Sequence, residues 1–195
     1  SGQRQVTVLV DGSNVIADSS AIAQHLERHT PEPALLPSDP AQRAQALLLE
    51  DWADTTLAAG CRLGLVQAAA SDPVLRGALL PEATPGPLRQ LVAGLPGPMG
   101  GAMADAVAGA VGTGEREHLL ANLELLLALV AAGPYLVGDQ LSLADLAVAA
   151  QLSLLKFPAS AGAPLAGRGA SGLADNPMLD PLFSWRDRIA AQVGR

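Results

Sequence analysis

The sequence contains a single cysteine, Cys61, among its 195 residues. One thiol excludes an internal disulfide and any paired-cysteine metal or redox motif, and it favours a reducing, cytoplasmic setting. Histidines are also few: His25 and His29 stand four residues apart, but no nearby third ligand completes a zinc site. We therefore expect no metal centre.

Aromatic residues and basic patches are scarce. Aromatic residues make up 3% of the chain, whereas hydrophobic residues as a whole make up 49%, so alanine and leucine supply most of the packing surface. That composition favours helices. The 12 lysines and arginines are scattered, and the net charge is -7. A nucleic-acid partner is not expected, because binding the phosphates requires a basic surface.

Long apolar runs are lacking as well. The most apolar stretch, 119–132, includes Asn122 and Glu124 and is shorter than the about 20 residues that cross a bilayer. We find no signal-peptide pattern before the first strand. No membrane partner is expected.

The chain divides into a short β-containing segment and a long helical one. Apolar strand-forming residues on both sides of the turn cluster Asp11–Asn14 predict a hairpin, and a helix follows to about residue 27. A proline-punctuated linker at 31–37 comes next. We expect a β-β-α segment over 1–30 and an all-helical domain over 38–195.

Helix start signals place the first element of the helical part. Asp39 and Pro40, with Gln42 completing a capping box, predict the start of a long helix that runs to about residue 72. Such a length is unusual for a globular helix, and a kink would fall near Gly60 or Gly64.

A second capping box stands later in the chain. Ser142 and Asp145 have its spacing, and the helix that follows them is almost wholly apolar. The further helices that the pattern predicts cover 88–93, 102–111, 115–132, 143–157 and a last segment that begins with Asn176 and Pro177.

Three stretches together resemble the glutathione transferase superfamily: QVTVLVDGSNVIADSSAI, YLVGDQLSLADLAVAAQL and the proline-rich linker between them. The most specific element is Ser142–Asp145 after Gly138 and Asp139, which resembles the capped core helix of the family's helical domain. The resemblance spans essentially the whole chain. It implies a mainly α fold, in which a glutathione transferase-like all-helical domain is preceded by a truncated thioredoxin-like β-β-α segment. Asp145 is expected to serve folding, since capping explains its position.

The family's first domain runs β-α-β-α-β-β-α, and this chain resembles its closing β-β-α. We therefore expect the native protein to have an earlier part, including the loop whose residue activates the glutathione sulfur. No residue of this sequence takes that catalytic role by motif, so the catalytic residue stays unknown. Cys61 is expected to be a buried structural thiol. If Ser1 is the true start, a non-catalytic member of the fold is the alternative.

The resemblance assigns glutathione, as co-substrate, to four residues. Ser19, with its N–H at a helix start, would bind the γ-glutamyl carboxylate and Asp18 the α-ammonium, unless either residue only caps the helix. Val6 would pair its backbone with the cysteinyl unit, and Gln5 would supply an amide unless it is a solvated strand end. Thr7 replaces the family's cis-proline, and a cis bond there would cost about 2.5 to 4 kcal/mol. We expect a trans Val6–Thr7 bond and weakened glutathione binding.

The implied function is conjugation of glutathione to small hydrophobic electrophiles, as in detoxification. A non-catalytic binding or assembly module of the same fold is the alternative, and a helical small-molecule binder unrelated to glutathione is a third. The substrate would lie against the helical domain.

A stripe of small residues on the long helix would serve either a ligand or close helix packing. Its members are Ala53, Thr56, Gly60 and Gly64. The family's two-fold interface implies a homodimer. The candidate contacts are Leu47, Trp52 and Ala53.

Overall fold

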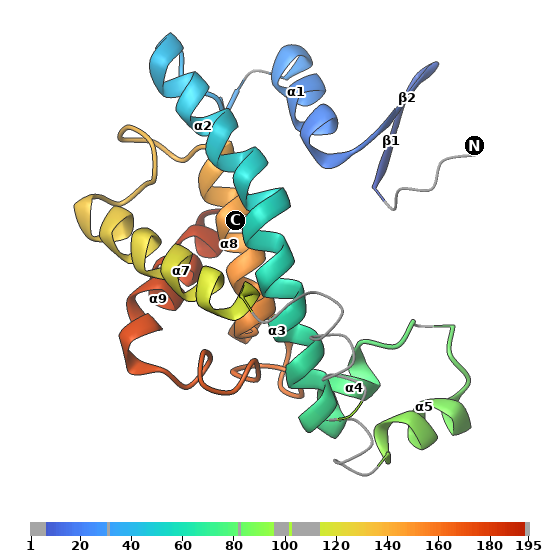
Figure 1. Cartoon of the computed structure of the whole chain (residues 1–195). Coiled ribbons are helices and arrows are strands. Elements are labelled where there is room, and N and C mark those ends of the chain that lie inside the picture. Colours follow the sequence, from blue (N-terminus) through green and yellow to red (C-terminus); the bar gives the residue numbers. More distant parts are fainter. Residues whose placement is uncertain (1–6, 31, 82, 96–101, 103–113, 194–195) are drawn as a thin grey trace.

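The computed structural model describes residues 7–30, 32–81, 83–95, 102 and 114–193. The fold is mainly α, as the sequence predicts, and Figure 1 shows a hairpin and one helix beside a larger helical body. In the hairpin, β1 (Val8–Asp11) pairs antiparallel with β2 (Asn14–Ala17). Within these residues no helix is both long and apolar enough to span a membrane.

The helices lie close to their predicted positions, except for the short helix at 73–78, which the sequence pattern does not predict. They are α1 (Ser19–His29), α2 (Pro40–Trp52), α3 (Ala58–Ser71), α4 (Pro73–Ala78), α5 (Gly86–Ala93), α7 (Glu115–Ala132), α8 (Leu143–Leu155) and α9 (Asp180–Val193). A 3-10 turn, Pro177–Leu179, precedes α9 and is capped by Asn176. The helix predicted over 102–111 lies almost entirely outside the described residues.

The long helix predicted from Asp39 is present but irregular. It consists of α2, a π-helical segment at Ala53–Leu57 and α3. The irregularity therefore precedes the two glycines, and the prediction of a kink near them is wrong. Instead they allow close packing: a Cβ on Gly60 would lie 3.0 Å from Leu119 Cδ1, and one on Gly64 3.0 Å from Leu155 Cδ2. This observation supports the packing interpretation of the small-residue stripe.

Helix α8 is the centre of the core and packs against α2, α3 and α9. Its start is fixed by Asp145, whose side chain is fully buried. The Asp145 Oδ2 atom accepts hydrogen bonds from the N–H and hydroxyl of Ser142 at 2.8 and 2.7 Å, and Oδ1 accepts from Leu136 N–H at 2.8 Å. The capping box and the folding role of Asp145 are confirmed.

Two local predictions need correction. Asp39 caps α2 by accepting from Ala41 and Gln42 N–H at 3.1 and 2.9 Å. The Gln42 side chain instead lies against Gly138, and among the described residues it does not accept from the Asp39 N–H to close a capping box. Ala53 is fully buried in the core of its own chain, so it is not available for the dimer contact that we predicted for it.

Candidate functional site

The start of α1 is the part of the predicted glutathione site that the structure describes. The chain passes from β2 to α1 through one residue, Asp18, which has φ 86° and ψ 129°. Positive φ is uncommon outside glycine, and backbone in such sparsely populated regions costs of order 1–3 kcal/mol. Asp18 is the one non-glycine residue with positive φ in the described part of the chain.

Capping alone does not explain this backbone. Asp18 Oδ2 accepts from Ala21 N–H at 3.1 Å, so Asp18 does cap α1. Asp39 and Asp72 cap α2 and α4 with ordinary φ values of -65° and -109°. An aspartate can thus cap a helix without strain, and the strain at Asp18 comes from placing the helix start directly against the end of β2.

This geometry leaves several polar groups at the helix start. Ser19 is exposed, and neither its N–H nor that of Ser20 has an acceptor among the described residues. The other Asp18 oxygen, Oδ1, likewise accepts no hydrogen bond from the described part of the chain. Free N–H groups at a helix start favour an anion, and a carboxylate beside them favours an ammonium. The two charged groups of a γ-glutamyl unit have matching chemistry.

Three contacts hold α1 in place. The Ser20 hydroxyl donates to Glu50 Oε1 on α2 at 2.5 Å, and Glu50 is buried. At the other end of α1, Glu27 accepts from the N–H groups of Leu35 and Leu36, both at 3.1 Å. The segment that joins the two parts of the chain is therefore fixed to α1.

The third contact joins α1 to the hairpin. The Nε2 atom of His25, a buried side chain, lies 2.8 Å from Asp11 Oδ2 at the end of β1. Figure 1 shows α1 between the hairpin and α2. The strained residue Asp18 therefore lies between two anchored elements.

Of the remaining residues considered for the site, the structure describes Cys61 but not Gln5 or Val6. Gln5 and Val6 lie outside the described residues, so the trans Val6–Thr7 bond stays a prediction. Cys61 is fully buried in the core, and burial raises the pKa of its thiol to about 12 despite the nearby Arg62 charge. At neutral pH it is therefore protonated and not a nucleophile, as expected.

The chain is similar in sequence to known proteins. The family described as glutathione S-transferase, C-terminal domain matches residues 88–188, just over half of the chain. FtsZ-localized protein A of Caulobacter vibrioides is 33% identical over 143 residues, covering 73% of this chain and 51% of that protein. The chain thus spans about half the length of this curated relative.

Solved structures share the fold. A glutathione S-transferase from Rhodospirillum rubrum superposes with a TM-score of 0.53 at 24% identity, covering 97% of this chain and 66% of that one. FzlA from C. crescentus gives 0.53 at 24%, covering 92% and 62%. The beta-etherase LigF from Sphingobium sp. strain SYK-6 gives 0.62 at 22%, covering 96% and 74%. The chain belongs to the glutathione S-transferase superfamily.

Proposed function

We propose that this chain binds the γ-glutamyl end of glutathione at the start of α1, as part of a protein that conjugates glutathione to small hydrophobic electrophiles. In this proposal residues 1–30 hold glutathione, 31–37 are a linker and 38–195 face the electrophile. The supporting observation is the strained Asp18, which leaves a carboxylate oxygen beside the free N–H and exposed hydroxyl of Ser19. Glutathione is also the ligand generally bound by the family.

Each candidate residue has a defined part in the proposal. The N–H groups at the start of α1 and the Ser19 hydroxyl bind the γ-glutamyl carboxylate, while Asp18 Oδ1 accepts from the α-ammonium. Gln5 and Val6 bind the cysteinyl part. Thr7 makes the affinity weak, because threonine does not readily support the cis geometry of the family's proline.

Calorimetric titration with glutathione tests this site. D18N keeps an acceptor for the helix cap and removes the charge that meets the ammonium, so we expect glutathione binding about tenfold weaker, as for loss of one charge-assisted hydrogen bond. D39N makes the same change at the cap of α2 and should leave binding unchanged. Equal affinity in wild type, D18N and D39N, or a wild type that binds tightly, would contradict the proposal as stated.

A non-catalytic binding or assembly module is the second candidate. It is favoured by the 33% identity with a relative whose name is FtsZ-localized protein A. Two assays on the native protein, with any residues that precede Ser1 included, separate the candidates: turnover of glutathione with an aryl halide, and co-sedimentation with polymerised FtsZ. Turnover supports conjugation, whereas co-sedimentation without turnover supports the module.

A further inference from the structure

A pocket of about 500 Å³ lies at the opposite end of the long helix from α1. It is formed by the end of α3, the first turn of α7 and the loop between α8 and α9. The polar side chains that line it are Gln67, Ser71, Asp72, Arg116, Arg168 and Ser171. Roughly 30 Å of helix, at about 1.5 Å per residue, separates Ser71 from Glu50, where α1 is anchored. The pocket is therefore distinct from the proposed glutathione site.

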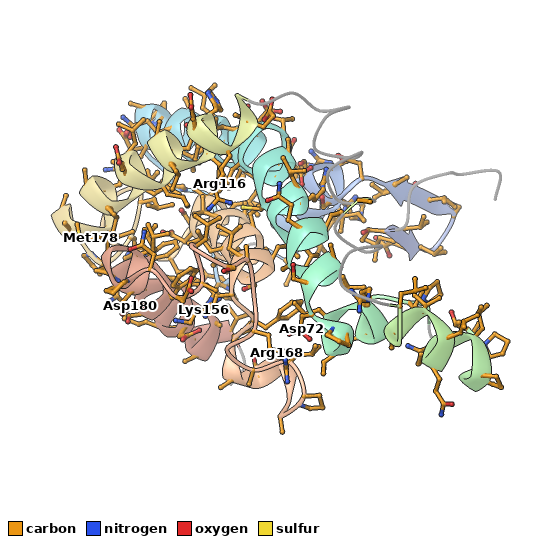
Figure 2. The ribbon with its side chains drawn as sticks, turned by 60° about the horizontal axis from the view of Figure 1, so that its bottom comes forward. Asp72, Arg116, Lys156, Arg168, Met178 and Asp180 are labelled. Carbon is orange, nitrogen blue, oxygen red and sulfur yellow. The ribbon has the colours of Figure 1, made fainter. Side chains whose placement is uncertain are left out.

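One end of this pocket is a fixed ion pair. Arg168 donates through Nη1 to Asp72 Oδ2 at 2.6 Å and through Nε to Pro164 O at 2.7 Å. Burial alone would raise the pKa of Asp72, but hydrogen bonds from Arg168 and from the N–H groups of Val74 and Leu75 outweigh it and lower that pKa. Figure 2 shows Asp72 and Arg168 side by side. This end offers both donors and acceptors in fixed positions.

The other end of the pocket carries a cation, Arg116, that has no ion-pair partner within the described ranges. Arg116 is exposed. It stands in the first turn of α7, where the helix dipole disfavours a positive charge. Its Nη2 atom lies against Gly172, 3.1 Å from the position that a Cβ would take there. Glu115 and Glu117 are next to Arg116 in the sequence, so each is displaced from it by about 100° around the helix, and neither forms an ion pair with it.

We propose that this pocket binds a small organic anion. Its carboxylate or phosphate group pairs with Arg116, and its polar remainder extends past Gln67 and Ser71 toward the Asp72–Arg168 pair. Guanidinium groups suit both oxyanions because they donate two parallel hydrogen bonds. The volume falls within the range of about 300 to 1,000 Å³ that small-molecule sites have. The anion enters at Arg116 because Arg168 is already partly neutralised by Asp72.

Titrations followed by amide resonances of the intact chain test the proposal, with inorganic phosphate, phenyl phosphate and phenylacetate as probes and sodium chloride at equal ionic strength as the blank. We expect saturable shifts at residues 168–172 with at least one probe. R116Q should weaken that binding at least tenfold. R62Q removes the same charge from another exposed arginine, on α3, and should change affinity less than twofold. S71L, which fills the pocket without changing charge, should also weaken binding.

The outcome with each probe identifies the anion. Tighter binding of phenyl phosphate assigns a phosphate ester, and tighter binding of phenylacetate assigns a carboxylate; either supports the proposal. Shifts that do not saturate, or equal losses in R116Q and R62Q, overturn it. Glutathione binding at α1 should be the same in R116Q as in wild type, so the two proposals fail independently.

Discussion

The strain at Asp18 has a measurable effect on stability. In D18G the backbone strain of about 1 to 3 kcal/mol is relieved, because glycine adopts positive φ readily. Replacing an aspartate cap by glycine loses only a few tenths of a kcal/mol, and the greater freedom of glycine in the unfolded chain costs about 0.4 to 1 kcal/mol. The strain is the largest of these contributions. D18G is therefore expected to be more stable than wild type by about 1 kcal/mol.

D39G is the matched control. It replaces the same residue type at the same helix position, but Asp39 has φ -65° and no strain to relieve. Only the unfavourable contributions remain, so D39G should lose about 1 kcal/mol. D18A should lose about 1 kcal/mol, because alanine removes the cap, while the strain is present in wild type and variant alike and does not change the difference.

The stability of the Asp18 variants requires two measurements, denaturant unfolding and amide hydrogen exchange. Denaturant unfolding followed by tryptophan fluorescence reports on Trp52 and Trp185, which belong to the helical part, so amide hydrogen exchange of α1 (Ser19–His29) must be measured as well. We expect slower exchange of α1 in D18G and faster exchange in D18A. If D18G is destabilised as much as D39G, the backbone at Asp18 is not strained. D18G also removes the carboxylate that is proposed to bind the α-ammonium, so weaker glutathione binding in D18G is expected from that loss and does not test the strain.

Two further predictions concern groups outside the start of α1. Cys61 should resist alkylation by iodoacetamide at pH 8 in the folded protein, because its thiol is buried with a pKa of about 12. Its modification should proceed only at the rate of unfolding. Fast modification of the native protein would contradict its burial. The pKa of Asp72 is lower in the folded protein than in the unfolded chain, where it is about 3.9. The ion pair with Arg168 therefore stabilises the fold above about pH 3.9, and this stabilisation is lost as the pH falls through the pKa of folded Asp72. Since Asp72 is partly exposed, the effect is small. R168Q should slightly weaken the dependence of the unfolding free energy on pH below about pH 4. An unchanged dependence would mean that solvent already screens the pair.

Features set by local sequence could be predicted well. The starts of α2 and α8 follow from short-range capping patterns at Asp39 and Ser142, and both lie where the sequence places them. The short helix α4 was missed although Asp72 and Pro73 repeat the aspartate–proline signal that identified α2. The sequence pattern predicts one long helix that ends near residue 72, whereas Asp72 both ends α3 and caps the next helix.

Features that depend on tertiary contacts could not be predicted from these patterns. The π-helical segment at Ala53–Leu57 has no proline or glycine to signal it, and it packs against α8. The sequence gives no signal for the positive φ of Asp18 either, since aspartate caps two other helices with ordinary φ values. The π-helical segment packs against α8, which lies far away in the sequence, whereas the backbone of Asp18 is set by the direct junction of β2 and α1.

Two arginines that are far apart in the sequence lie in the same pocket. Lysines and arginines scattered singly along the chain predict that no nucleic acid is bound, and this stays a prediction; one pocket with two arginines does not alter it, because a row of phosphates requires a row of cations. Yet Arg116 and Arg168, 52 positions apart by their numbers, line one pocket because α7 begins beside the loop that follows α8. A small anion requires only one or two guanidinium groups in a fixed place. Scattered charge therefore disfavours a polyanion as partner but has no bearing on a single carboxylate or phosphate.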